Sequence, residues 1–454
     1  MKDFPSKKPD IAHIVSVHMG LGHLRAAYPL RNFSREGIII WGSGKFAGPG
    51  EKKYWRAVRK IYYFLSRSGS YPVIGRLSLK TILAIQNIPS FYPRKDRRRS
   101  TSAVKFLKLL IEKAGLCRTL SGHLSSENLP VIHTFYATAI AQEMLLRREN
   151  KQRNIYLLIC DADINRVWVP EKPQESRIKY LVPCTRVKSR LLSYGVKEEQ
   201  IFMTGFPLPV ENIGTETGLE VLRLDLKARL KRLDPKGKFF AYHRHSVSHL
   251  LGKNNPNETV DDRLTVMFAI GGAGAQVNLV DKIIIGLQDF IRSGRIRLVL
   301  SCGVKRQVLE KVLKFINTRG LLNQIGRNIE LVFHDEVFNY FEQFNCWLRQ
   351  TDVLWTKPSE LSFYCALGLP VLMSEPIGPQ EEYNKRWLTE IHAGLEPPGL
   401  PEYCGEWLMD LRDNGRLAEA AWDGFLKARK LGYYKIKRLI ETGEYNEDIS
   451  PLNQ

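Results

Sequence analysis

The chain has 454 residues, of which 44% are hydrophobic and 25% charged, and this length suits two or three globular domains rather than one. The seven cysteines are scattered singly, with no CxxC pair, which argues against a disulfide framework or a zinc site and for reduced thiols. No run of about 18 apolar residues and no apolar leader is present, so we expect a cytoplasmic protein. The net charge of +21 predicts an anionic partner: a nucleotide, a membrane surface or a nucleic acid.

Strands and helices alternate through the first half of the sequence. Apolar strands are predicted at residues 11–17, 37–41, 130–133, 155–160 and 180–182, with helices after the first and third of them. This series predicts a mainly parallel sheet covered on both faces, whose ligands lie at the carboxyl ends of the strands. We assign residues 1–208 to this domain.

The pattern pauses at residues 209–263, which we interpret as a linker that carries a polar insertion. A second alternating series follows, with strands expected at 264–270, 296–301, 329–333, 353–355 and 370–373. We therefore expect an α/β protein of two facing Rossmann-like domains with parallel sheets. The second domain spans 264–420, and a helical tail covers 421–454.

The first glycine turn, which contains Gly20, Gly22 and His23, follows the first strand and opens a helix. Glycines at this point let a ligand approach the backbone and the free N–H groups of the helix. The turn is not a dinucleotide-binding motif, because Arg25 stands in place of the third glycine. His23 is a candidate general base; the alternative is a tight turn with a capping histidine.

The second glycine turn, with Gly271, Gly272 and Gly274, also lies between a strand and a helix. Its backbone amides suit a diphosphate at a positive helix end. The alternative is a βα turn that is merely tight.

Polar residues cluster after the strand at 353–355 and again after the strand at 370–373. We expect the first cluster to bind ribose hydroxyls and phosphate, and the second to hydrogen-bond sugar hydroxyls. Each cluster alone is more often a solvated helix start. The candidates are Lys357, Ser359 and Glu360, followed by Gln380, Glu381 and Asn384.

Other candidates follow the strands of the first domain. Asp161 is a candidate acid–base or orienting group, whereas Asp163 is at least as well explained by an N-cap or a salt bridge. His133 is a candidate for the acceptor side of the cleft, with a structural histidine as the alternative. We predict no metal site at His243, His245 and His249, because their spacing lacks the pattern of zinc motifs.

These segments resemble glycosyltransferase family 28, the group of monogalactosyldiacylglycerol synthase and the lipid II-forming UDP-N-acetylglucosamine transferase. The similar stretches are residues 20–27, 131–141, 158–168, 180–209, 271–276 and 352–388. The resemblance implies a GT-B fold, a UDP-sugar donor bound by the C-terminal domain, and inversion at the anomeric carbon. It also implies no metal and no cofactor, and an aspartate facing the cleft at Asp161.

Two positions depart from the family pattern. Phe363 occupies the place of a glutamate that grips the donor ribose, so Glu360 substitutes for it or the donor is bound differently. Pro358 replaces a loop glycine. Transfer of a hexose or N-acetylhexosamine to a membrane-linked or glycan acceptor is the leading hypothesis. A UDP-sugar 2-epimerase and a catalytically eroded sugar-nucleotide-binding subunit remain alternatives.

Basic and aromatic residues alternate along 52–65, and a second basic run at 94–99 precedes an amphipathic run at 104–114. A basic helix with an aromatic face can lie on an anionic membrane, which would make the protein peripheral at the inner face. The alternative is a solvated helix with its aromatics in the core. We do not expect nucleic-acid binding, because no recognised module accompanies the charge.

Overall fold

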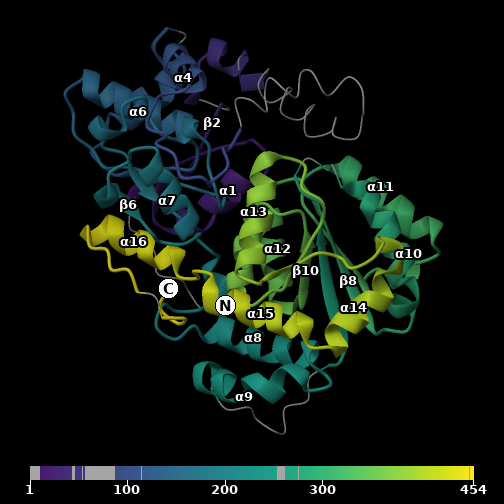
Figure 1. The fold of residues 1–454 in the computed structure, drawn as a ribbon. Coiled ribbons are helices and arrows are strands. Elements are labelled where there is room, and N and C mark those ends of the chain that lie inside the picture. The colour runs from purple at the N-terminus through teal and green to yellow at the C-terminus, as the bar shows by residue number, and fades with distance from the viewer. Residues whose placement is uncertain are drawn as a thin grey trace, which may run out of the picture.

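A computed structural model describes residues 11–42, 46–53, 55–56, 87–113, 115–252, 261–272, 274, 276–448 and 450–454. The described chain contains two six-stranded sheets whose recorded strand pairs are all parallel. Each sheet lies in its own half of the molecule, and helices flank both (Figure 1).

The N-terminal sheet has the strand order β2-β1-β3-β4-β5-β6. Its second strand from the edge, β1 (Ala12–Val17), is buried along its whole length, as a parallel strand covered on both faces must be. The chain runs from β1 to one side for β2 and returns to the other side for β3. The remaining strands are β2 (Ser34–Trp41), β3 (Val131–His133), β4 (Ile155–Leu158), β5 (Lys179–Leu181) and β6 (Ile201–Phe202).

Helices connect these strands. α1 (Gly22–Ala27) follows β1 and continues into the 3₁₀ helix η1 (Pro29–Phe33), where a proline opens the tighter turn. The later helices are α4 (Ser102–Lys113), α5 (Arg118–Leu124), α6 (Tyr136–Arg148) and α7 (Thr185–Ser193).

The C-terminal sheet has the order β12-β11-β10-β7-β8-β9, so the chain direction across the sheet reverses between β7 and β10. Ligands of open α/β sheets bind at such a switch point, at the carboxyl ends of the strands. The strands are β7 (Leu264–Ala269), β8 (Ile296–Gly303), β9 (Ile329–Phe333), β10 (Val353–Thr356), β11 (Val371–Met373) and β12 (Gly394–Leu395).

The helices of this half cover both faces of the sheet. α10 (Val277–Arg292) and α11 (Arg306–Thr318) lie on one side, and α12 (Val337–Gln350) and α13 (Pro379–Glu390) lie on the other (Figure 1). The 3₁₀ helix η8 (Glu360–Leu367) follows β10. The others are α8 (Glu220–Leu233), α9 (Lys238–Leu251), α14 (Cys404–Asp413), α15 (Arg416–Lys427) and α16 (Gly432–Thr442).

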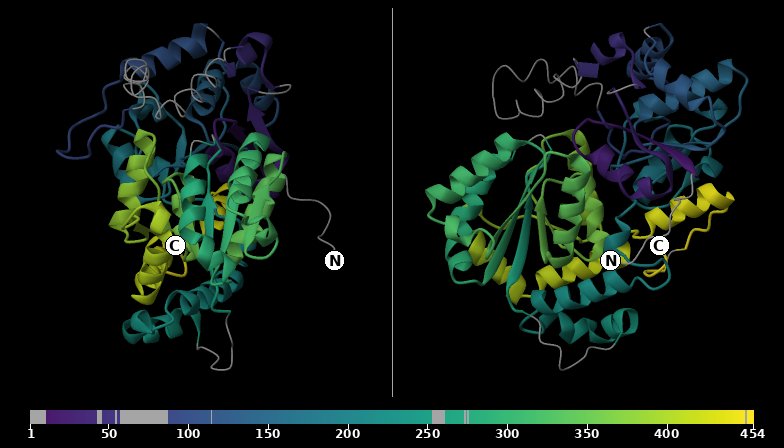
Figure 2. Two further views of the ribbon diagram at one scale, coloured as in Figure 1. Left: turned by 90° about the vertical axis from the view of Figure 1, so that its right-hand side faces the viewer. Right: turned by 180° about the vertical axis from the view of Figure 1, so that it is seen from behind.

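The C-terminal helices return the chain from the second half to the first. Figure 2 shows α15 and α16 running from the C-terminal sheet toward the N-terminal half. There the ring of Tyr433 in α16 lies 5.7 Å from that of Phe33. A Cβ atom at Gly432 would stand 2.3 Å from the Phe206 carbonyl oxygen, so only glycine permits this approach. The two halves are thus joined by α16 as well as by the linker.

This architecture confirms the predicted fold class: two facing Rossmann-like domains with parallel sheets and a C-terminal helix, which is the GT-B fold. Part of the polar insertion predicted within 209–263 forms helix α9, whose Phe239, Val247 and Leu251 are buried, and residues 253–260 of it lie outside the described residues. The two-residue strands β6 and β12 and the helices α7, α12 and α13 were not among the predicted elements. None of the helices among the described residues combines the length and apolar composition needed to cross a bilayer.

Candidate functional site

The two glycine turns lie at the carboxyl ends of β1 and β7, and they touch each other across the domain boundary. A Cβ atom at Gly272 would stand 2.8 Å from Cγ of Leu21 and 3.3 Å from the Leu21 amide nitrogen. Gly20 and Gly271 adopt left-handed φ angles of 73° and 79°, a region that favours glycine. The two turns therefore pack backbone against side chain where the two domains meet.

His23 lies in the first turn of α1, and its ring is enclosed by aromatic neighbours. The ring centroid lies 5.4 Å from that of Phe135 and 6.3 Å from that of Trp168, and Nδ1 lies 3.8 Å from Sγ of Cys160. Burial lowers the pKa of His23 to about 4, against the raising effects of the Thr134 carbonyl and Glu360. The imidazole is therefore neutral at pH 7, and the lowered pKa makes it a weaker base than an exposed histidine.

Asp161 and Asn384 connect the two domains directly. Asn384, in α13, accepts a hydrogen bond from the Ala162 amide at 2.7 Å and donates one to Oδ1 of Asp161 at 3.0 Å. Burial raises the pKa of Asp161 to about 6; the Asn384 hydrogen bond opposes this rise, and the nearby carboxylates of Glu360 and Glu381 add to it. The sequence candidates from opposite halves of the chain thus share one site.

Lys357 and Glu381 form an ion pair beside the second glycine turn. Glu381 also accepts a hydrogen bond from the Ile377 amide at 2.7 Å, which fixes the loop before α13. A Cβ atom at Gly271 would stand 3.3 Å from Cε of Lys357. The ammonium group is therefore held close to the turn that we expect to cradle the diphosphate.

Glu360 begins η8 and faces the N-terminal domain. Its Oε1 accepts a hydrogen bond from Nε of Arg25 at 3.2 Å, and its Oε2 lies 3.0 Å from the point that a Cβ atom of Gly22 would occupy. A carboxylate thus stands at the mouth of α1. Ser359, Gln380 and Gly274 also lie on loops or first turns of this half, and a Cβ atom at Gly274 would stand 2.9 Å from Val308.

Two candidates from the first domain have structural partners. His133 is fully buried, and its Nδ1 lies 3.0 Å from Oγ1 of Thr138. Burial lowers the pKa of His133 to about 3. Asp163 accepts two hydrogen bonds of 2.7 Å from Arg190, which is the salt bridge that we considered as its alternative role.

Phe363 lies in the hydrophobic core. Its side chain is 3% exposed, its ring stacks on Phe206 with centroids 5.2 Å apart, and Trp387 lies 4.9 Å away. The buried phenyl ring of Phe363 has no atom that can form a hydrogen bond with a ribose hydroxyl. Glu360, three residues earlier, is a carboxylate that reaches the N-terminal domain.

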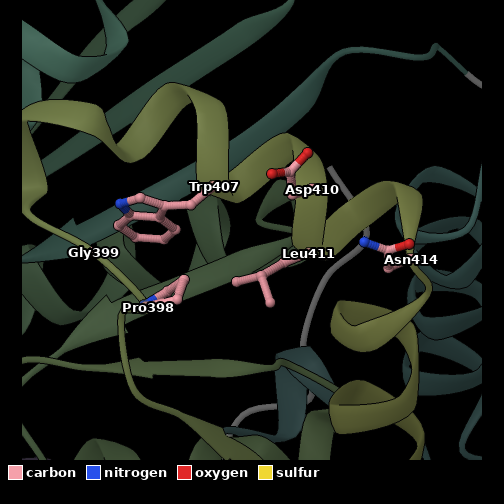
Figure 3. A pocket seen from close by; sticks show the side chains of 6 residues that line it. All are labelled: Pro398, Gly399, Trp407, Asp410, Leu411 and Asn414. Atoms are coloured by element: carbon pink, nitrogen blue, oxygen red, sulfur yellow. The ribbon is translucent and has the colours of Figure 1, made fainter.

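A hollow of about 320 Å³ lies elsewhere in the C-terminal half, along α14 (Figure 3). Trp407, Leu411 and Pro398 form its apolar wall, with Asp410 and Asn414 at its edge. It contains none of the predicted site residues. Within the described residues, no cluster of three or more histidine, cysteine, aspartate or glutamate side chains is arranged to hold a metal ion.

Sequence reasoning missed three contributors to the site: Arg25, Cys160 and the carbonyl of Thr134. Arg25 was visible only as the residue that replaces a third glycine. Nothing in its sequence context indicates that its side chain reaches the other domain, because that contact spans 335 positions of the chain.

A family model described as a domain of unknown function (DUF6938) matches residues 257–328 and 319–438. No curated protein matches the chain in sequence. Among solved structures, MurG of Acinetobacter baumannii is 12% identical with a TM-score of 0.45, and the match covers 95% of this chain and 99% of that one.

Two further similar structures are described as epimerases. A putative UDP-N-acetylglucosamine 2-epimerase of Listeria monocytogenes is 16% identical (TM-score 0.45, covering 97% and 98% of the two chains). The UDP-GlcNAc 2-epimerase of Neisseria meningitidis bound to UDP-GlcNAc is 12% identical (TM-score 0.45, covering 96% and 100%). Similarity at this level assigns neither an activity nor a substrate to the chain.

Proposed function

We propose that this protein is an inverting, metal-independent glycosyltransferase. It moves a hexose or N-acetylhexosamine from a UDP-sugar to a lipid-linked or glycan acceptor. The observation that carries the proposal is the meeting of a neutral histidine from one domain with a glycine turn and a lysine from the other. Sugar transfer requires these two functions, a base for the acceptor and a cationic cradle for the leaving diphosphate, at one place.

The acceptor side of the reaction falls to His23. The neutral imidazole accepts the proton of the acceptor hydroxyl while the oxygen of that hydroxyl attacks the anomeric carbon of the donor sugar. The bond between that carbon and the diphosphate oxygen breaks, and UDP leaves with the bonding electron pair. A single displacement of this kind inverts the anomeric configuration.

The donor side falls to the turn at Gly271, Gly272 and Gly274 and to Lys357. Amides at the start of α10 and the lysine ammonium stabilise the negative charge that develops on the diphosphate. Glu360 binds the ribose, which the phenyl ring of Phe363 cannot do, because a carboxylate accepts hydrogen bonds from a pair of ribose hydroxyls. Gln380, on α13, is assigned to the sugar hydroxyls, whereas the buried amide of Asn384 is bonded to Asp161 and to the Ala162 amide.

Product analysis tests the activity. The full chain is incubated with radiolabelled UDP-glucose, UDP-galactose or UDP-N-acetylglucosamine in the presence of diacylglycerol vesicles or a soluble glycan. Label transferred to lipid or glycan, with release of UDP, supports the proposal. A new UDP-sugar without transfer would identify an epimerase, and binding by calorimetry without turnover would identify a sugar-nucleotide-binding subunit.

We further propose that helix α4 docks the acceptor domain on an anionic membrane. Phe106 and Leu109, three residues apart, are 55% and 50% exposed, whereas Val104 and Leu107 on the opposite side are buried. Lys105 and Lys113 are exposed on the same helix. In this arrangement the two apolar side chains would enter the acyl region of the bilayer, and the lysines would contact the negatively charged headgroups.

The other predicted membrane segment, 52–65, lies mostly outside the described residues. Within it, Trp55 is 3% exposed and its ring lies 4.7 Å from that of Trp41. Trp55 is therefore part of the domain core and not of a membrane-facing surface.

A further inference from the structure

Arg25 is an unusual residue for its place in the fold. It lies one turn into α1, and it is 3% exposed although its side chain leaves its own domain. Glycine at this position of a Rossmann-like turn allows close packing between helix and strand. Here a long cation extends from the helix into the opposite domain instead.

The C-terminal domain encloses the guanidinium group. Nε donates to Oε1 of Glu360 at 3.2 Å, and the central carbon lies 4.3 Å and 4.5 Å from the ring centroids of Phe344 and Phe341 on α12. Burial lowers the pKa of Arg25, but Tyr364, Tyr340 and Glu360 outweigh burial and raise it overall, so the group stays charged. The pocket that receives Arg25 is thus electronegative and aromatic.

Stability alone gives a poor reason for this arrangement. Nη1 of Arg25 is buried and forms no hydrogen bond within the described part of the chain. A buried ion pair with an unsatisfied donor is on balance no more stabilising than apolar residues of the same volume. The best attested use of such pairs is to fix one relative position of two elements.

The elements fixed in this way carry the proposed chemistry. His23 precedes Arg25 by two residues on α1, and Glu360 stands within 3.0 Å of the Cβ position of Gly22. Resting on the proposed function, we infer that Arg25 is a positioning residue. It locks the helix that carries the base onto the donor domain and holds Glu360 in place at the donor site.

The test is a double-mutant cycle in the full chain, with the variants Arg25→Met, Glu360→Gln and both together. Amide hydrogen exchange of α1 and of residues 270–272 is measured alongside UDP affinity and turnover. Arg186→Met is the matched control, because Arg186 forms an ion pair with Glu390 between the same two domains at the exposed rim. Arg25→Lys keeps the charge but not the planar fork and serves as the second variant.

In Arg25→Met we expect exchange in α1 to quicken by at least about tenfold. We expect turnover to fall by roughly 10²-fold, because a small displacement of a catalytic group has an effect of this size. Exchange of α1 in the double variant should be no faster than in the faster single variant, since both changes remove the same ion pair. Arg186→Met should change neither quantity, and Arg25→Lys should recover only part of each loss.

Unchanged exchange in Arg25→Met, or additive effects of the two changes on the exchange of α1, would overturn the inference. If Arg25→Met fails to fold, the same comparison is made between Arg25→Lys and Glu360→Gln. If the wild-type chain neither binds UDP nor turns over, the proposed function falls. The exchange measurements still decide the role of Arg25, because they need no substrate.

Discussion

Burial shifts the pKa values of the two candidate acid–base residues, His23 and Asp161, in opposite directions. It lowers the pKa of His23 to about 4 and raises that of Asp161 to about 6, because burial disfavours the charged form of each. The histidine is neutral at pH 7, and the aspartate is close to its titration range. At pH 7 the domain contact thus contains a neutral imidazole, which its lowered pKa makes a weaker base than an exposed histidine, and a carboxyl group that changes charge near neutral pH.

Replacement of His23 tests the base. His23→Ala should lower turnover by roughly 10²-fold or more, with UDP affinity intact, because the imidazole acts on the acceptor and not on the donor. Steady-state kinetics and calorimetry separate the two effects. His392→Ala, at an exposed position, is the control. Near-normal turnover in His23→Ala would assign the base to another group, Asp161 first.

Asp161 gives a pH dependence that requires no substrate. A carboxyl group whose pKa is raised in the folded state stabilises the fold below its unfolded pKa and loses that contribution as pH rises through about 6. Asp161→Asn should therefore become more stable relative to the wild type between pH 4 and pH 7. Urea unfolding at both pH values measures the difference, which should reach at most about 3 kcal/mol. An equal difference at the two pH values would show that Asp161 is not titrating there.

At the scale of elements, the contact between the glycine turns links donor binding to domain contact. A valine at Gly272 meets Leu21 of the other domain before it meets any ligand. Gly272→Val should therefore push the turns apart and abolish UDP binding while the two domains remain folded.

The rescue of this variant separates two causes. Leu21→Ala in the Gly272→Val background removes the clashing side chain. If UDP affinity recovers, the loss of binding in Gly272→Val is caused by the clash between the domains. If it does not recover, the loss is caused by the change in the glycine turn that binds the diphosphate. Calorimetry with UDP decides, and unchanged affinity in Gly272→Val alone would remove the site assignment.

At the scale of the whole molecule, the net charge of +21 bears on the membrane proposal. Cations near an anionic surface each contribute about 1 kcal/mol and are screened over a Debye length of about 8 Å at physiological salt. The chain should co-sediment with vesicles that contain phosphatidylglycerol at low salt and dissociate as salt rises. Phe106→Ser combined with Leu109→Ser should weaken this binding.

Leu322→Ser is the matched control, because Leu322 is 49% exposed in the other domain. It should leave vesicle binding unchanged. A wild-type chain that stays in the supernatant at low salt would argue for a soluble acceptor. Binding that is insensitive to the α4 changes would place the docking surface elsewhere.

The sequence by itself was sufficient for the fold class and for the existence of the strands near the site, although β4 ends at Leu158 and not at the predicted residue 160. Continuous apolar runs such as residues 264–269 are buried on both faces, and a run of that kind has few alternatives in an α/β protein. Glycines within three residues of the ends of β1 and β7 located both turns, because only local backbone geometry is needed to recognise them. The two-residue strands β6 and β12 carry too few residues to show a pattern.

Contacts between distant parts of the chain were decided only by the tertiary structure. Asn384 and Asp161 were separate candidates until α13 was placed against the end of β4, and Arg25 had no visible partner until α1 met η8. The sequence indicates only that Phe363 stands where the family has a glutamate. The tertiary structure shows that its ring packs between Phe206 and Trp387. Local propensity and periodicity act over a few residues, whereas burial, pairing and pKa depend on neighbours that the fold brings together.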